Sequence, residues 1–207
     1  MIAECAPWKD ELLKDADLIE RWAAKTRPSE RGSILIERKV FVSAFAMRKL
    51  IECEKVSNEI EGRSVRAERF DLQPGQKLDW WKRHSFWEAF DVEAPATCSL
   101  GVRDLLDIIV HSKVFSERVY AEDDLRVSGF FVTSDRRDNH LWLVSLTAYT
   151  ELMRRIGNDY PNFRIVFDEE GKHFSWRGHG KPPVHIAKKM ETTISRRITP
   201  APKEGAA

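Results

Sequence analysis

An aspartate and a histidine lie four residues apart in the most apolar run of the chain, LLDIIVHSK, residues 105–113. On a helix, side chains at positions i and i+4 are neighbours, so Asp107 can hydrogen-bond one ring nitrogen of His111. Such a bond fixes the tautomer of the imidazole and leaves its other nitrogen available as a general acid or base. The same spacing also fits a polar pair that ties a buried helix to its neighbour. Both interpretations stay open at this point.

Two arginines are candidates for the positive charge that phosphate chemistry needs near such a histidine. Arg48 lies in the apolar stripe of an expected helix, where a cation either reaches the rim or meets a partner. Arg103 lies one helical turn before Asp107. If the chain is an enzyme, we expect His111 as general acid or base and Asp107 as its orienting partner. Arg48 or Arg103 would then stabilise the charge on the phosphate.

A second candidate site is the basic segment 172–197, which holds seven basic residues and one acidic residue. Its cations can follow the phosphates of single-stranded RNA while its aromatic side chains stack on bases. The residues that we single out for nucleic-acid binding are Lys172, Phe174, Trp176, Arg177, Lys181, Lys188 and Lys189. A solvated hairpin with a basic tail has the same composition, so the composition of this segment does not distinguish RNA binding from simple solvation.

The stretch DWWKRHSFW, residues 79–87, also allows two interpretations. Its aromatic residues alternate with cations, as in a nucleic-acid contact, but we favour a place in the core for Trp80, Trp81 and Trp87.

Several common chemistries lack their sequence signatures in this chain. The patterns GxxxxGK[ST], GxGxxG, HExxH, GxSxG and the EF-hand loop are absent, which argues against the nucleotide, redox, protease and hydrolase classes that carry them. The six-residue spacing of His173, His179 and His185 does not match the ligand pairs of a zinc site. We therefore expect neither a cofactor nor a bound metal.

Charge and hydropathy bear on location and partners. The 34 basic and 33 acidic residues give a formal charge of +1, so no global field favours nucleic acid or membrane. No apolar run approaches the roughly 20 residues that span a bilayer, and the acidic, amphipathic N-terminus does not resemble a signal peptide. Cys5, Cys53 and Cys98 fit reduced thiols. We expect a cytoplasmic protein with no membrane partner; RNA, another protein and a second copy of the chain stay open as partners.

The elements that must position these residues indicate an α+β protein, with a helical N-terminal half and β-hairpins in the C-terminal half. We expect one domain over residues 1–207. Its helical part spans about 8–113, its β-rich part about 114–178, and a basic, flexible tail about 179–207. The hydrophobic fraction of 42%, with seven Trp and eleven Phe, is enough for a folded core.

Helical periodicity predicts a helix over about 8–25 and a second from Ser29 or Ser33 to about Lys55. The charged residues 56–79, which include QPGQK, are expected to form a partly exposed connection.

The helix that carries the aspartate and the histidine is expected to have its body over 100–113, with Thr97 or Ser99 as its cap. Two β-rich runs around DRRDN predict a hairpin, and FRIVF and KHFSW predict another. Thr147 is the expected cap of the helix between the two hairpins.

The run LDIIVHS, preceded by SLGVRDL, resembles the last helix of HEPN-type domains, the higher eukaryote and prokaryote nucleotide-binding superfamily. The signature of that family is an arginine, a polar residue, three further residues and a histidine. Asp107 and His111 match the polar and histidine positions, whereas Leu106 stands where the arginine belongs. The resemblance extends from the second expected helix to about Lys113.

This resemblance implies a metal-independent ribonuclease that acts as a dimer in toxin–antitoxin or antiviral defence systems. Because the motif arginine is missing, the charge would have to come from Arg48 or Arg103, with Ser112 or Lys113 at the edge of the site. Without such a charge, the resemblance implies a degenerate domain that binds RNA, or a complex containing RNA, and does not cleave it. The alternative from another class is a protein-interaction module in which Asp107 and His111 are structural.

Overall fold

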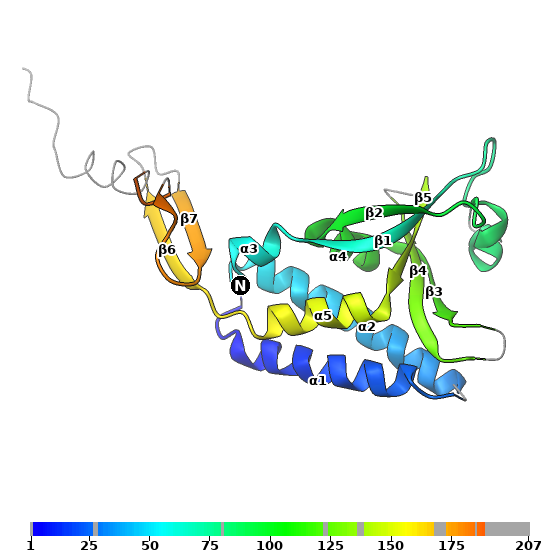
Figure 1. Cartoon of the computed structure of the whole chain (residues 1–207), viewed down its shortest axis with the longest axis horizontal. Coiled ribbons are helices and arrows are strands. Elements are labelled where there is room, and N and C mark those ends of the chain that lie inside the picture. Colours follow the sequence, from blue (N-terminus) through cyan, green and yellow to red (C-terminus); the bar gives the residue numbers. More distant parts are fainter. Residues whose placement is uncertain are drawn as a thin grey trace, which may run out of the picture.

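Helices pack against one face of an antiparallel sheet in this chain (Figure 1). The computed structural model describes residues 2–26, 29–79, 81–121, 124–135, 139–167, 173–184 and 186–188, excluding the side chains of 165–167 and 173–174. Its helices and strands confirm the predicted α+β class. None of the helices within these ranges combines the length and apolar character needed to span a bilayer.

The helices α1 (Ala6–Ala23) and α2 (Glu30–Glu52) lie close to the ranges that the sequence predicts. The other helices are α3 (Asn58–Glu61), α4 (Val102–Val110) and α5 (Leu146–Gly157), with a 3₁₀ segment η1 (Trp81–Glu88). Ser29 caps α2, as predicted, because its hydroxyl accepts a hydrogen bond from the Gly32 N–H at 3.1 Å. The cap of α5 is Ser145 and not the predicted Thr147.

The main sheet has the strand order β2-β1-β5-β4-β3, and each neighbouring pair is antiparallel. Its strands are β1 (Ser64–Asp71), β2 (Ala96–Gly101), β3 (Ser112–Val119), β4 (Val127–Ser134) and β5 (His140–Ser145). A separate hairpin of β6 (Asn162–Phe167) and β7 (His173–Gly178) lies beside α3 (Figure 1). Both predicted hairpins are therefore confirmed, while the turn residues 136–138 and 168–172 lie outside the described residues.

Two predictions for the first half of the chain are wrong. Residues 56–79 are not only a connection, because they contain α3 and β1, which pairs with both β2 and β5. Thr97 and Ser99 do not cap a helix but lie in β2, so the next helix begins only at Val102. Both strands therefore fall within the part of the chain that was expected to be mainly helical.

The core lies on two faces of the main sheet. The larger cluster joins one sheet face to α1, α2, α4 and α5, and includes Leu105 and Ile109 of α4. The smaller cluster lies on the other face, where Phe86 of η1 packs with Phe70 and Leu141. Trp81 and Trp87 are 84% and 53% exposed, so the prediction that they lie in the core is wrong. Trp80 lies outside the described residues.

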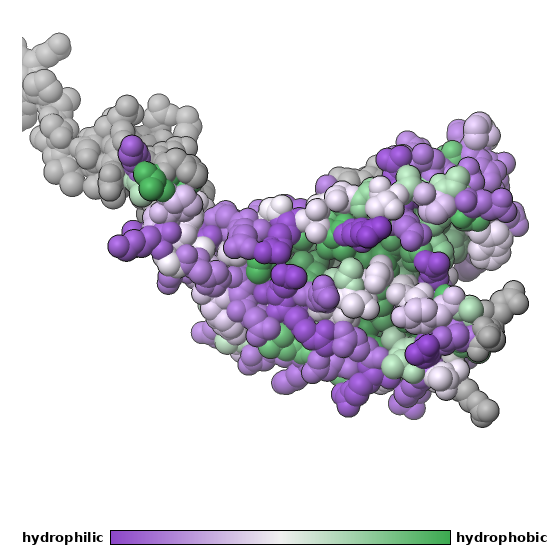
Figure 2. All heavy atoms as spheres, viewed as in Figure 1, coloured by the Kyte–Doolittle hydropathy of each residue, from purple (hydrophilic) through white to green (hydrophobic). Residues whose placement is uncertain are grey.

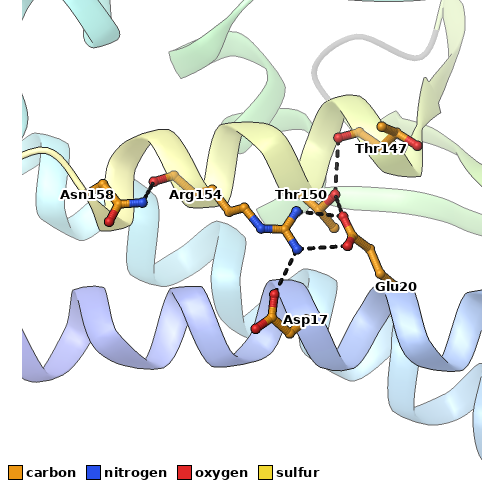
Figure 3. A network of polar contacts seen from close by, with 6 residues as sticks. All are labelled: Asp17, Glu20, Thr147, Thr150, Arg154 and Asn158. Atoms are coloured by element: carbon orange, nitrogen blue, oxygen red, sulfur yellow. Dashed lines mark hydrogen bonds and ion pairs between the residues drawn. The ribbon is translucent and has the colours of Figure 1, made fainter.

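An ionic clamp holds α1 against α5 (Figure 3). Arg154 of α5 donates from Nη1 to Oε1 of Glu20 at 2.6 Å and from Nη2 to Oδ1 of Asp17 at 2.8 Å. The Thr150 hydroxyl also donates to Glu20 at 2.6 Å. The hydrogen bonds from Arg154 are the main reason why the pKa of Glu20 falls to about 2. On the same face, Figure 2 shows hydrophilic residues over α1 and apolar atoms in the recess between β1 and α5.

Candidate functional site

Arg48 lies at the centre of a polar cluster formed by α2 and the end of α4. Its Nη1 atom lies 3.2 Å from Nε2 of His111 and 3.0 Å from Oδ1 of Asp107. Its Nε donates to Oε1 of Glu52 at 2.8 Å. The structure thus brings together three of the four predicted catalytic residues, although α2 and α4 are separated in the sequence by α3, β1, η1 and β2.

The contact predicted between Asp107 and His111 is absent, and the orienting role assigned to Asp107 is therefore wrong. α4 ends at Val110, and His111 is its C-cap residue, with φ −106° and ψ 24°. The backbone N–H of His111 still donates to the carbonyl oxygen of Asp107 at 3.0 Å, so the two residues lie one helical turn apart. Within the described ranges, no hydrogen bond joins the two side chains; each contacts Arg48 instead.

The contact between Arg48 and His111 defines the tautomer of the imidazole. A guanidinium only donates hydrogen bonds, so Nε2 of His111 must be the acceptor. The neutral ring therefore carries its proton on Nδ1 in this arrangement, and Nε2 has a free lone pair once Arg48 moves aside. Nε2 is the atom on which a general base would take up a proton.

The cluster lies at the surface and borders a small pocket. The side chains of Arg48 and Asp107 are 30% and 51% exposed, so a solute can reach both. The pocket has a volume of about 80 Å³ and is lined by Arg48, Ile51, Glu52, Arg103, Leu106 and Asp107. Such partial exposure differs from the fully buried polar pair of the structural interpretation.

Arg103 lines the same pocket but is paired elsewhere. Its Nε donates to Oε1 of Glu61 at 2.7 Å, and Oε2 of Glu61 accepts from Nη2 of Arg177 at 2.7 Å. Leu106, at the position of the family's arginine, is buried in the core. Of the two predicted arginines, only Arg48 contacts His111.

Of the residues singled out in the basic segment, two are buried and two are exposed in the described part of the chain. Trp176 and Arg177 are buried, because β7 packs beside α3 and the backbone N–H of Arg177 donates to Oδ1 of Asn58 at 2.7 Å. This burial is incompatible with the nucleic-acid contacts predicted for the two side chains. Lys181 and Lys188 are exposed. The remaining members of the predicted set, Lys172, Lys189 and the side chain of Phe174, lie outside the described residues.

Sequence reasoning missed Glu52, the second carboxylate on Arg48. Hydrogen bonds from Lys49 and Arg48 hold the pKa of Glu52 below its usual value. The signal was present, since Glu52 follows Arg48 by four residues on α2 and opposite charges at this spacing are neighbours.

A buried lysine close to this cluster was also missed, and its sequence context gives no sign of it. Lys9 of α1 is fully buried, where its Nζ donates to the carbonyl oxygen of Lys55 at 2.8 Å and to that of Asp159. Burial lowers the pKa of its ammonium group. Its Nζ also lies 4.3 Å from the centre of the Tyr160 ring. Lys9 thereby joins α1 to the segments that follow α2 and α5.

Among the described residues, no group of three or more His, Cys, Asp and Glu side chains is arranged to hold a metal ion. The three cysteines are free thiols. Comparisons with protein-family models, with curated proteins and with solved structures found no match to this chain. The site is accordingly interpreted from its own geometry.

Proposed function

We propose that the chain is a metal-independent endoribonuclease whose site consists of His111 and Arg48. The observation that carries this proposal is the 3.2 Å contact between Nη1 of Arg48 and Nε2 of His111 at a partly exposed position. It joins a neutral imidazole, able to take up a proton, to a cation able to bind phosphate. The likeness of Asp107 and His111 to the HEPN signature also supports the proposal, because Arg48 supplies from α2 the charge that Leu106 cannot.

In the proposed reaction, a phosphodiester of RNA replaces His111 as the partner of Arg48. Nε2 of His111 then takes the proton of the ribose 2′-hydroxyl, whose oxygen forms a bond to phosphorus. The bond between phosphorus and the 5′ oxygen breaks, and solvent protonates the leaving oxygen. The products are a 2′,3′-cyclic phosphate and a free 5′-hydroxyl, with the extra negative charge of the transition state held by the guanidinium.

The two carboxylates have a different role in this mechanism. Asp107 and Glu52 hold Arg48 from two sides, at 3.0 Å and 2.8 Å, and so keep its guanidinium beside His111 in the absence of RNA. Both are also anions that compete with phosphate for the same cation. Asp107 is thus a positioning residue for Arg48.

We also propose a cytoplasmic location, where RNA is available and thiols stay reduced. The three free cysteines and the absence of a spanning helix in the described part of the chain are consistent with that location.

The test is cleavage of a labelled RNA of mixed sequence in the presence of EDTA. Wild type should cleave, and His111→Ala should lose cleavage by a factor of about 10² or more while keeping the circular dichroism spectrum of the wild type. His140→Ala is the matched control, because His140 is also partly exposed and paired with a charged side chain, Asp71, at 2.8 Å. Absence of cleavage by wild type, or equal cleavage by His111→Ala, would overturn the proposal.

A protein-interaction role is the second candidate, and the exposure of Trp81 and Trp87 on η1 favours it. Large apolar side chains that lie together at a surface are typical of contact sites. In this case RNA would not be cleaved at any salt concentration, and the cluster around Arg48 would serve only to hold α2 against α4.

A further inference from the structure

A pocket of about 640 Å³ lies next to the cluster around Arg48. It is formed where the start of α1, the end of α2 and the chain leading into β6 meet. Glu52 lines both this pocket and the small pocket at Arg48. Oε1 of Glu52 accepts a hydrogen bond from Nε of Arg48, so the carboxylate that pairs with Arg48 borders both spaces.

Two aromatic side chains line the larger pocket and stay accessible there. Tyr160 is 50% exposed and Phe163 is 49% exposed. The ammonium group of buried Lys9 lies 4.3 Å from the centre of the Tyr160 ring, and this cation–π contact restrains the ring. Exposed rings fixed in a pocket are suited to stacking with a flat aromatic ligand.

The formal charges that line the pocket balance, with Lys9 and Lys55 against Glu52 and Glu54, and three of these four side chains are hydrogen-bonded within the chain. Lys55 lines the pocket and makes no side-chain hydrogen bond or ion pair with any other described residue. Its ammonium group is therefore available to an anion. Arg48 lies next to the pocket, since its Nε donates to Oε1 of the lining residue Glu52.

We propose that this pocket binds an unpaired base of single-stranded RNA, stacked on Tyr160 and Phe163, while an adjacent phosphate contacts Arg48. This inference rests on the proposed ribonuclease function and names its substrate. In duplex RNA each base is paired and stacked on its neighbours, so it cannot enter the pocket. A volume of about 640 Å³ is within the range of pockets that hold small organic ligands.

The experiment measures binding separately from cleavage. A fluorescent single-stranded oligonucleotide with 2′-fluoro riboses lacks the attacking hydroxyl, so its binding can be followed by anisotropy without cleavage. Tyr160→Ala and Phe163→Ala should each raise the Kd about tenfold, as for the loss of one stacked base. Tyr160→Phe keeps the ring and should stay within about twofold of wild type. Tyr120→Ala, at an exposed tyrosine that does not line this pocket, should do the same.

Absence of binding by wild type, or equal Kd values for wild type, Tyr160→Ala and Phe163→Ala, would overturn the inference. Binding to a duplex of the same sequence that is as tight as to the single strand would also overturn it.

Parallel assays with unmodified RNA keep the two proposals apart. If the alanine variants bind more weakly than wild type but wild type does not cleave, the base-binding pocket is supported and the ribonuclease proposal is contradicted. If wild type cleaves and the alanine variants bind and cleave as well as wild type, the ribonuclease proposal is supported and the base-binding pocket is contradicted.

Discussion

Nη1 of Arg48 lies 3.2 Å from Nε2 of His111, across the interface between α2 and the end of α4. The contact joins a guanidinium to an imidazole, and the carboxylates of Asp107 and Glu52 both pair with that guanidinium. Because the cluster is partly exposed, the arrangement is open to a substrate and contributes little to folding.

Replacement of His111 should change stability only slightly. Contacts between partly exposed charged and polar side chains contribute about 1 kcal/mol or less to the free energy of unfolding. We therefore expect His111→Ala to lower it by less than about 1 kcal/mol in urea denaturation. A loss of about 2 to 3 kcal/mol would show that His111 belongs to a structural polar network, as the protein-interaction alternative requires.

Replacement of Arg48 should abolish cleavage, since no other cation contacts His111 among the described residues. We expect Arg48→Ala to lower the cleavage rate by about 10² to 10³, the usual effect of losing a group that stabilises transition-state charge. Arg48→Lys should recover only part of the rate, because an ammonium group cannot contact phosphate through two parallel hydrogen bonds. Arg38→Ala, at an exposed arginine on the same helix, is the control and should cleave as wild type does. An active Arg48→Ala variant would remove Arg48 from the mechanism.

Asp107→Asn distinguishes the role found here from the one expected from the sequence. Since Asp107 contacts Arg48 and not His111, the substitution removes an anion that competes with phosphate. We expect tighter binding of the 2′-fluoro oligonucleotide, by a few fold, and less than a tenfold change in cleavage. A loss of cleavage of about 10³ or more, with binding unchanged, would indicate that Asp107 acts through the imidazole after all.

Three of the residues singled out from the sequence, Arg48, Asp107 and His111, lie together, although several elements around them were predicted wrongly. The stripe of α2 and the Ser29 cap are local patterns, and they placed Arg48 in the apolar stripe of a helix without indicating that this stripe meets α4. The end of α4 was placed too late, because the apolar run continues into residues of β3 and its periodicity does not distinguish the two. The expected contact between Asp107 and His111 is replaced by contacts of both side chains with Arg48, which is distant in the sequence.

The sequence did not predict the strands β1 and β2, and their residue pattern and pairing explain why. One side of β1 is lined by Val65 and Ala67 and packs on the core, but Arg66 and Glu68 alternate with them and raise the charge of the segment. Pairing of β1 with β2 and β5 joins residues that are far apart in the chain, which no local pattern indicates. The burial of Lys9 and Arg177 likewise depends on segments distant in the sequence.

The clamp between α1 and α5 should make stability sensitive to acid. The pKa of Glu20 is lowered to about 2 in the folded chain from 4.5, so its contribution is complete above pH 4.5 and is lost as the pH falls through about 2. Arg154→Ala should therefore lower the free energy of unfolding near pH 6, by about 1 kcal/mol because the pair is partly exposed. The difference from wild type should shrink toward pH 2. Arg155→Ala, at the exposed neighbouring arginine, should show no such trend, and a difference for Arg154→Ala that is independent of pH would contradict the assignment.

The most direct test of the central proposal uses a single-stranded DNA oligonucleotide that contains one ribonucleotide. Attack by a 2′-hydroxyl is possible at only one phosphate of this substrate. In EDTA, wild type should cleave on the 3′ side of the ribonucleotide and leave a 2′,3′-cyclic phosphate, whereas His111→Ala and Arg48→Ala should leave the strand intact. Cleavage at deoxynucleotides, cleavage by folded His111→Ala, or no cleavage by wild type would contradict a ribonuclease site made of His111 and Arg48.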